Sequence, residues 1–377
     1  MRIIEFMDMK STKYGGLGKF MLRLMEQMPN DEFWFVFQNV PGSQQMLADF
    51  HDFGAHVVTI DTEGKQALTH LWSVAKLFRA VRPDIVHFHF ANGFFFFAPL
   101  AKLLGIKHLV KTQHCCITTD DMRQVRNKRE LSMKTRLASR NGKVYQLFDK
   151  IIMCSQYVKK QFVQVYGDSS KYEMTYFGVE PVNILNEREQ QRLRSQLNIR
   201  PEDKTICSVL FADPVKAPDV LIKALPYIDN NNFVVLLVGI NDNMPYAQEL
   251  HQMARKLGVD EKIRWVGITD HVNHYLSISD IYCQPSRSEA LGLAVCEAKS
   301  AHLPVVGSNV GGLPEISDCV FQSEDERDLG RLLTELLADG ELRHRLSEQS
   351  YRAYEKHFDI KVGVEKYAEI YHDLMKS

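Results

Sequence analysis

The chain has 377 residues, of which 45% are hydrophobic and 25% charged, and its net charge at neutral pH is −1. This length and composition are those of a soluble globular protein with room for two domains of ordinary size. The seven cysteines include no C-x-x-C pair, which argues against a disulfide framework and for reduced thiols in a cytosol. No segment has the run of about 18 apolar residues that is needed to span a bilayer, so we expect a cytoplasmic protein.

The charge is unevenly distributed along the chain. Residues 1–180 contain 24 Lys and Arg against 17 Asp and Glu, whereas residues 181–377 contain 22 against 30. The two halves therefore carry net charges of opposite sign. A basic half is the one expected to meet an anionic surface, which here could be the inner face of the cell membrane.

Short apolar strands alternate with helical stretches along the first half, which predicts a parallel sheet between helices. The expected strands are 3–7, 33–37, 56–60, 85–88, 108–112 and 150–154. The expected helices are 19–27, 68–81 and 93–104.

A second series of strands is expected at 205–210, 233–238, 263–266, 281–284 and 304–306, and a last helix at 359–375. Gly178 and Pro181 separate the two series. The sequence thus predicts an α/β protein with domains 1–180 and 181–358 and a C-terminal helix over 359–377. Ligands are expected at the carboxyl ends of the strands.

The segment 286–297 reads S-R-S-E-A-L-G-L-A-V-C-E and carries the strongest chemical signal. It places Glu289 in a turn and Glu297 in the helix that follows, with Gly292 between them. The start of a helix offers unpaired N–H groups and the positive end of a dipole, which suits a diphosphate. Carboxylates accept hydrogen bonds from sugar hydroxyls, so the segment predicts a nucleotide-sugar pocket.

The residues around this segment extend the pattern. Pro285-Ser286 precede it, Ala298 follows Glu297, P-V-V stands at 304–306, and G-G-L-P-E stands at 311–315. This order resembles the signature of glycosyltransferase family 4, the retaining GT-B enzymes. The resemblance implies two Rossmann-like domains with parallel sheets facing across a central cleft, and a C-terminal helix that returns to the first domain.

The first half adds weaker motifs in the order of the same family. Residues 13–19 read K-Y-G-G-L-G-K, 83–89 read P-D-I-V-H-F-H, and 111–114 read K-T-Q-H. In the family a G-G loop such as that at Gly16 approaches the donor phosphates, and the histidine matching His114 lines the reaction centre. A lone histidine at a strand end is more often structural, but these surrounding motifs favour a catalytic role for His114.

One departure from the family concerns its V-G-R-L-x-x-x-K-G motif. Residues 209–217 read V-L-F-A-D-P-V-K-A, so Lys216 is kept while Phe211 replaces the arginine and Leu210 the glycine. A phenyl ring cannot replace a guanidinium that binds phosphate through two hydrogen bonds. Either Lys13 or Lys19 compensates, donor affinity is reduced, or catalysis has been lost.

The resemblance also implies roles for individual residues. The catalytic set is Glu289, His114 and Lys216. The donor-binding set is Gly16, Lys216, Gly239, Ile268, Glu289, Ala290, Leu291, Gly292, Leu293 and Glu297. Glu289 would hold the donor sugar, Glu297 the ribose, and main-chain groups near Gly239 and Ile268 the base. The donor is expected to be UDP- or GDP-linked, and the absence of a D-x-D motif predicts no metal and no other cofactor.

The binding surface for the acceptor is predicted from a basic stretch over residues 123–143, in which Glu130 is the only acid. The residues singled out are Arg123, Arg126, Arg129, Arg136 and Arg140. They form either a solvated basic helix or a surface for anionic lipid headgroups or a lipid-linked diphosphate acceptor. Nucleic acid is not an expected partner.

The favoured hypothesis is a retaining hexosyl- or N-acetylhexosaminyltransferase. It would act on a glycan or lipid-linked acceptor in surface polysaccharide or glycoconjugate biosynthesis. Two alternatives remain open: a GT-B module that binds nucleotide sugars without turnover, which Phe211 supports, and a nucleotide-sugar epimerase of the same fold.

Overall fold

The structure is a computed structural model, and it describes the chain except for residues 8, 12–13, 61–66, 91–93, 117–142 and 377. The chain divides into two compact units, Met1–Gly178 together with Ile360–Ser377, and Val179–Asp359. Each unit has its own sheet, and all the paired strands that the structure describes run parallel. The α/β class with parallel sheets, predicted from the sequence, is therefore confirmed.

The first unit contains a seven-stranded sheet in the order β3-β2-β1-β4-β5-β6-β7. Its strands are β1 (Arg2–Phe6), β2 (Glu32–Phe37), β3 (His56–Thr59), β4 (Ile85–Phe88), β5 (His108–Gln113), β6 (Lys150–Met153) and β7 (Tyr172–Met174). Its described helices are α1 (Gly16–Gln27), α2 (Gln44–Asp52), α3 (Ala67–Val81), α4 (Phe94–Leu103), α7 (Gln156–Tyr166) and α16 (Ile360–Lys376). Most residues of β1, β4 and β6 are fully buried, as expected for strands covered by helices on both faces.

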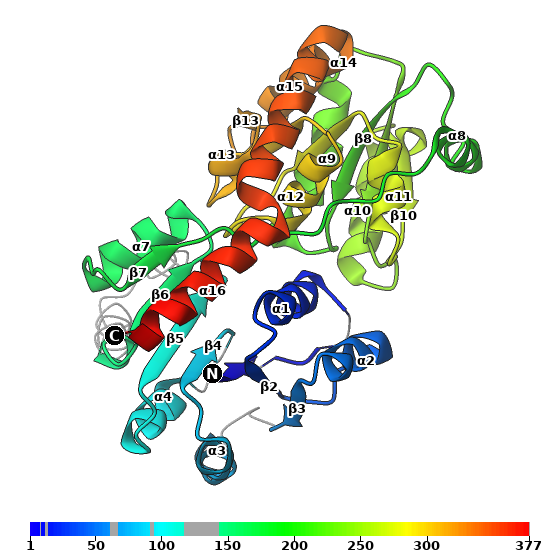
Figure 1. The fold of residues 1–377 in the computed structure, drawn as a ribbon. Helices are drawn as coiled ribbons and strands as arrows, with labels where there is room; N and C mark the ends of the chain where they lie inside the picture. Colours follow the sequence, from blue (N-terminus) through cyan, green and yellow to red (C-terminus); the bar gives the residue numbers. More distant parts are fainter. Residues whose placement is uncertain (8, 12–13, 61–66, 91–93, 117–142, 377) are drawn as a thin grey trace. The chain divides into compact units, whose positions relative to one another are not determined.

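Helix α16 belongs to the first unit although it is the last element of the chain, and it lies beside α1 (Figure 1). The buried face of α16 includes Gly363, Tyr367 and Tyr371. A Cβ on Gly363 would lie 2.9 Å from the Phe20 ring of α1 and 3.1 Å from the backbone of Tyr176 and Gly178. Glycine is therefore what allows this close approach of the helix.

The second unit contains a six-stranded sheet in the order β10-β9-β8-β11-β12-β13. Its strands are β8 (Lys204–Val209), β9 (Phe233–Val238), β10 (Ile263–Val266), β11 (Ile281–Gln284), β12 (Val305–Ser308) and β13 (Cys319–Phe321). Its α-helices are α8 (Glu187–Gln196), α9 (Pro218–Ala224), α10 (Pro245–Lys256), α11 (Val272–Ser277), α12 (Leu293–Ser300), α13 (Leu313–Ile316), α14 (Glu326–Ala338) and α15 (Gly340–Ala353). Shorter turns are the 3-10 segments η1 (Pro214–Lys216), η2 (Leu225–Tyr227) and η3 (Asp260–Lys262) and the π-helical segment η4 (Tyr354–Phe358).

Local sequence explains several helix starts. Asn186 and Glu189 form a reciprocal capping box at α8, and the side chains of Ser155, Asp325 and Asp339 accept N–H bonds at the starts of α7, α14 and α15. Helix α12 begins differently, without a side-chain cap. Its first N–H groups are left for other partners, a point that matters for the site.

Each sheet has one position where the strand order reverses, between β1 and β4 in the first and between β8 and β11 in the second. Open parallel sheets bind ligands outside the carboxyl ends of the strands at such switch points. Among the helices that the structure describes, none is long and apolar enough to cross a membrane.

Candidate active site

Lys216 and Glu289 come from the two strands that flank the switch point of the second sheet. Lys216 ends η1 after β8, and Glu289 lies in the turn between β11 and α12. Their side chains form a salt bridge, with Nζ 2.7 Å from Oε2. The structure thus brings together the expected cation and carboxylate where such sheets bind ligands.

The double-glycine turn after β12 supports Glu289. Gly311 has a φ of +59°, and a Cβ there would lie only 1.8 Å from the carbonyl oxygen of Glu289. The N–H of Gly312 donates to the same oxygen at 3.0 Å. Only glycine fits at Gly311, and this contact fixes the backbone from which the Glu289 side chain extends.

Helix α12 starts at Leu293, one residue after Gly292, whose φ is +98°. Ala290 and Leu291 precede the helix in the turn, and Leu291 is buried. Because no side chain caps α12, its first N–H groups and the positive end of its dipole could meet an anion.

Glu297 is the fifth residue of α12 and is half-buried. Burial raises the pKa of the neighbouring Cys296 thiol to about 12, and the nearby carboxylates of Glu297 and Glu289 act in the same direction. The charges of both glutamates therefore act on the same thiol of α12.

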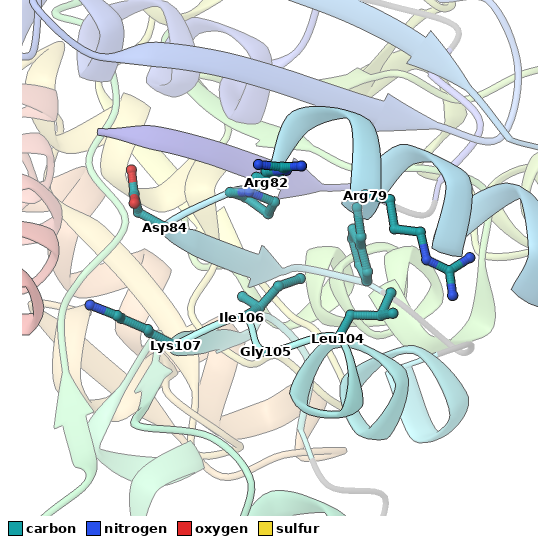
Figure 2. A pocket seen from close by; sticks show the side chains of 9 residues that line it. Arg79, Arg82, Asp84, Leu104, Gly105, Ile106 and Lys107 are labelled. Atoms are coloured by element: carbon teal, nitrogen blue, oxygen red, sulfur yellow. The ribbon is translucent and has the colours of Figure 1, made fainter.

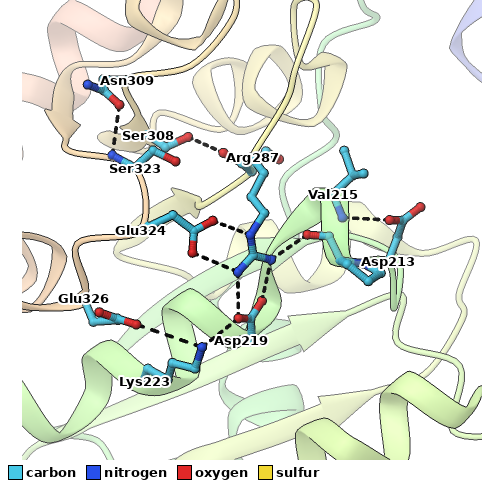
Figure 3. A network of polar contacts seen from close by, with 12 residues as sticks. Asp213, Val215, Asp219, Lys223, Arg287, Ser308, Asn309, Ser323, Glu324 and Glu326 are labelled. Atoms are coloured by element: carbon cyan, nitrogen blue, oxygen red, sulfur yellow. Dashed lines mark hydrogen bonds and ion pairs between the residues drawn. The ribbon is translucent and has the colours of Figure 1, made fainter. Parts of the chain in front are cut away.

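Arg287, two residues before Glu289, anchors the loop that carries Lys216 (Figure 3). Its guanidinium forms two parallel hydrogen bonds with Asp219, both 2.8 Å, and donates to the carbonyl oxygen of Pro214 at 2.6 Å. The guanidinium also pairs with Glu324, and the backbone N–H of Arg287 donates to the carbonyl oxygen of Val215. These bonds fix the turn on both sides of Lys216.

The carboxylate of Asp219 is ionised within this network. Burial alone would raise its pKa, but hydrogen bonds from Arg287, Lys223 and Tyr246 outweigh burial and hold the pKa well below its usual range. Hydrogen bonding to Asp219 and Glu324 raises the pKa of the Arg287 guanidinium. The Arg287 guanidinium is thus paired with two carboxylates, and it does not take the place of the family arginine that Phe211 replaces.

Phe211 follows β8, and 64% of its side chain is exposed. Leu210 beside it is buried, and the residue after Lys216, Ala217, has a left-handed backbone with a φ of +53°. Ala217 stands where the family pattern has glycine, so the turn keeps the glycine-type conformation without the glycine.

Gly239 and Ile268 follow the neighbouring strands β9 and β10. Gly239 has a φ of +99°, and a Cβ there would lie 2.7 Å from the carbonyl oxygen of Leu210, so this position also requires glycine. Ile268 is 53% exposed. Both lie at the carboxyl edge of the second sheet, the same edge as Lys216.

The switch point of the first sheet holds a buried polar network. Glu5 of β1 is the register partner of His87 on β4, and its carboxylate accepts hydrogen bonds from Tyr371 (2.7 Å) and lies 2.8 Å from Nε2 of His89. His87 Nε2 lies 2.8 Å from the Thr112 hydroxyl, which lies 3.0 Å from that of Tyr367. His87 Nδ1 is also hydrogen-bonded to Tyr371.

Burial governs the ionisation of this network. Burial raises the pKa of Glu5 to about 8, although the Tyr371 hydrogen bond opposes the shift. Burial lowers the pKa of His89 to about 3, and that of His87 well below its usual value. The histidines are therefore neutral near pH 7.

Glu5, His87 and His89 are the one group of metal-ligand types that the described residues bring within 4.8 Å. Their side-chain atoms already bond to one another and to Tyr371 and Thr112. We interpret the cluster as a hydrogen-bonded network and not as a metal centre.

His114 follows β5 and is half-buried, with Nε2 3.0 Å from Nδ1 of His89 and its ring stacked on Phe90. Gly16 begins α1, and Lys19 is exposed on the same helix. These residues belong to the first unit, whereas the other expected donor residues belong to the second. Lys13 and the basic residues Arg123, Arg126, Arg129, Arg136 and Arg140 lie outside the described residues.

A cavity of about 480 Å³ lies elsewhere, where β4 and β5 begin (Figure 2). Its lining includes Arg79, Arg82 and Lys107, whose charged ends do not converge on one point. It contains none of the expected site residues and opens at the opposite ends of the strands from His114.

Four residues that matter for the site were not found from the sequence: Glu5, Tyr371, Asp219 and Arg287. Glu5 could have been identified from the sequence, because it is an acid inside an otherwise apolar first strand. Arg287 occupies an unspecified position of the family motif, and its partners come from separate segments. No local pattern predicts such a cluster.

Comparisons with known proteins identify the family and the fold of the chain. The model of "Glycosyltransferase Family 4" matches residues 14–182, and that of "Glycosyl transferases group 1" matches residues 189–353. D-inositol 3-phosphate glycosyltransferase from Mycobacterium marinum is 28% identical over 170 residues, which are 44% of this chain and 36% of that protein. The chain thus matches less than half the length of this relative.

Two solved structures share the fold over nearly the whole chain. Anabaena HepE in complex with UDP has a TM-score of 0.83 at 16% identity, with 99% of this chain and 100% of that chain covered. WaaG, a glycosyltransferase involved in lipopolysaccharide biosynthesis, has a TM-score of 0.69 at 16% identity, with 97% and 99% covered. Each unit therefore has the parallel-sheet architecture of GT-B proteins, as predicted. The chain belongs to glycosyltransferase family 4.

Proposed function

We propose that the protein is a retaining glycosyltransferase that moves a hexosyl or N-acetylhexosaminyl group from a UDP- or GDP-linked sugar to a glycan or lipid-linked acceptor. The observation that carries the proposal is the Lys216–Glu289 pair at the switch point of the second sheet, beside the uncapped start of α12. HepE has also been solved with UDP-glucose, which is consistent with such a donor.

The chemistry requires stabilisation of a leaving diphosphate and of a developing positive charge on the sugar. Lys216 and the first N–H groups of α12 would bind the diphosphate. Glu289 would accept hydrogen bonds from the donor sugar and Glu297 from the ribose, while main-chain groups near Gly239 and Ile268 would contact the base. Attack from the same face as the leaving group, with the phosphate helping to deprotonate the acceptor, would retain the anomeric configuration.

We further propose that the acceptor belongs to surface polysaccharide or glycoconjugate biosynthesis and that transfer needs no metal, because the chain has no D-x-D motif. The test is a donor-by-donor screen of UDP- and GDP-sugars for binding by calorimetry and for slow hydrolysis. Assays with EDTA and with added Mn²⁺ or Mg²⁺ run in parallel. Loss of all activity in EDTA, restored by either metal, would refute the metal-free mechanism.

One observation favours a second candidate function, a binding module without turnover. Phe211 is exposed at the position of the family arginine, and Arg287 is bound to carboxylates instead. The same screen separates the two functions. Donor binding with neither hydrolysis nor transfer would favour the binding module, and product formation would exclude it.

A further inference from the structure

Glu5 is connected to His114 through a single intervening side chain. The carboxylate Oε2 of Glu5 lies 2.8 Å from Nε2 of His89, and Nδ1 of His89 lies 3.0 Å from Nε2 of His114. Glu5 and His89 are buried, whereas His114 is half-buried at the carboxyl end of β5. A buried carboxyl group thus reaches the histidine of the expected reaction centre through two hydrogen bonds.

A neutral imidazole has one N–H donor and one acceptor nitrogen. With the Tyr371 hydroxyl donating to Oε1 of Glu5, this chain then has two consistent arrangements. If Glu5 is ionised, His89 donates from Nε2 to it and accepts at Nδ1 from the Nε2–H of His114. If Glu5 is protonated, it donates to His89, which donates from Nδ1 to His114. The hydrogen of His114 is then on Nδ1.

The neighbouring groups restrict the hydrogen bonds that the Glu5 carboxyl group can make. Its second oxygen, Oε1, accepts the hydroxyl of Tyr371 from α16. The Lys111 ammonium donates to the carbonyl oxygens of His89 and Thr112, and both of these are backbone atoms. Among the residues that the structure describes, none forms a hydrogen bond with Nδ1 of His114.

We propose that Glu5 is a positioning residue that determines, through His89, which ring nitrogen of His114 carries hydrogen. Nδ1 of His114 is then either a donor to an oxygen of the bound substrates or an acceptor for a hydroxyl. The assignment of His114 to the reaction centre rests on the proposed function, but the link from Glu5 to its tautomer does not.

The groups that face Glu5 make its carboxyl the one that exchanges a proton near neutral pH. These groups are His87 on β4, His89 just after β4, and Tyr371 and Tyr367 from α16. Lys111 of β5 and His114 after it act on the two histidines. Burial raises the pKa of Glu5 to about 8, while burial lowers the pKa of His114 and His89 and raises that of Tyr371. Nδ1 of His114 should therefore carry hydrogen below about pH 8 and lose it to Nε2 above that pH.

The test is NMR of the full chain with ¹⁵N-labelled histidine at a pH below and a pH above this transition. A ring nitrogen with hydrogen and one without differ in ¹⁵N shift, and the His114→Gln variant assigns the signal. Glu5→Gln should hold the low-pH tautomer at both pH values, because its amide donates to His89 as a protonated carboxyl does. Tyr371→Phe keeps the link to His89 but removes the bond that lowers the pKa of Glu5, so its transition should move to higher pH.

A wild-type exchange that is absent in Glu5→Gln and shifted in Tyr371→Phe supports the proposal. One tautomer at both pH values in the wild type, or an unchanged exchange in Glu5→Gln, overturns it. Should Glu5→Gln fail to fold, the direction of the Tyr371→Phe shift decides. The NMR result needs no substrate, so failure of every donor in the activity screen would overturn the proposed function and leave this inference to its own test.

If the screen finds a donor, kinetics add a second measurement. The wild-type kcat should change with the same midpoint as the His114 signal, whereas kcat of Glu5→Gln should not vary across that pH interval. A purely structural role for Glu5 predicts instead a loss of activity at every pH with the wild-type pH profile. That result would also count against the proposal.

Discussion

The ammonium nitrogen of Lys216 and the carboxylate oxygen Oε2 of Glu289 lie 2.7 Å apart, although 73 residues separate them in the sequence. The side chains are 30% and 14% exposed, so each compensates a charge that is only partly hydrated. A nucleotide-diphosphate sugar could take over both partners, with its phosphates on Lys216 and its hydroxyls on Glu289. The ion pair thus neutralises two partly buried charges at the switch point of the second sheet.

Glu297→Ala should weaken donor binding, because the carboxylate is expected to accept hydrogen bonds from the ribose hydroxyls. Hydrogen bonds to a charged group contribute about 1.5–3 kcal/mol, which corresponds to an affinity loss of roughly ten- to a hundredfold. Calorimetric titration of the folded variant measures it. Glu335→Ala is the matched control, since Glu335 is 55% exposed on α14. Unchanged donor affinity in Glu297→Ala would remove Glu297 from the site.

Phe211→Arg should tighten donor binding, because it returns a guanidinium to the position that binds phosphate in the family. Phe211 is 64% exposed, so the replacement should cost little folding stability. One charge-assisted bond of about 1.5–3 kcal/mol implies at least a tenfold gain at low salt, and a smaller gain at high salt.

The control for this gain is Phe211→Gln, which introduces a polar side chain without charge. Calorimetry with UDP and GDP at two salt concentrations compares the three proteins. An equal gain in the Gln variant, or none in the Arg variant, would show that position 211 does not face the phosphates.

The sheets could be predicted because strand positions recur as short apolar runs between helices. β4, β9, β10 and β11 have the predicted bounds: β9 is a continuous apolar run, and each of the other three has a single polar residue among apolar ones. β7 and β13 were missed because each has only three residues, which is too short for a periodic signal.

The site was predictable only in part, for a related reason. Lys216 and Glu289 each lie in an ordered motif that follows a strand, so both could be named. The bond between Tyr371 and Glu5 joins residues 366 positions apart and depends on where α16 packs. Local patterns carry no information on such pairs, whose geometry is set by tertiary packing.

The basic stretch, apart from Lys143, lies outside the described residues, so its prediction rests on sequence alone. If it docks on an anionic membrane, each basic residue near the surface contributes about 1 kcal/mol. Replacing Arg126, Arg129, Arg136 and Arg140 by Gln should then largely abolish binding to anionic liposomes at low salt, while activity on a soluble acceptor is kept. Equal binding of variant and parent in a flotation assay would mean a solvated basic segment.

Gly363→Ala should destabilise the first unit. The added Cβ would lie 2.9 Å from the Phe20 ring and 3.1 Å from the Gly178 nitrogen and the Tyr176 carbonyl oxygen, so α16 must move. Overpacking of this kind costs about 1–3 kcal/mol, measurable by denaturant unfolding. Gly340→Ala, where the nearest atom is 3.5 Å away at the end of a flexible arginine, should not destabilise. Equal stability of the two variants would contradict the packing argument.

Arg287→Ala should lower stability and donor affinity together, because Arg287 joins Asp219, Glu324 and the carbonyl oxygen of Pro214 beside Lys216. The loss leaves Asp219, whose side chain is 8% exposed, with fewer donors. We expect about 1.5–3 kcal/mol less stability in denaturant unfolding at neutral pH. The matched control is Arg331→Ala, whose exposed pair with Asp328 should be worth less than about 1 kcal/mol.

The pH dependence of this effect follows from Asp219, whose folded pKa is depressed by its hydrogen-bond donors despite burial. A depressed pKa contributes stability above the unfolded value of about 3.9, and that contribution is lost as the pH falls toward the folded pKa. The stability difference between wild type and Arg287→Ala should therefore be constant near neutral pH and shrink as the pH falls below about 4. A difference that is unchanged in acid would show that Arg287 acts through packing and not through the Asp219 charge.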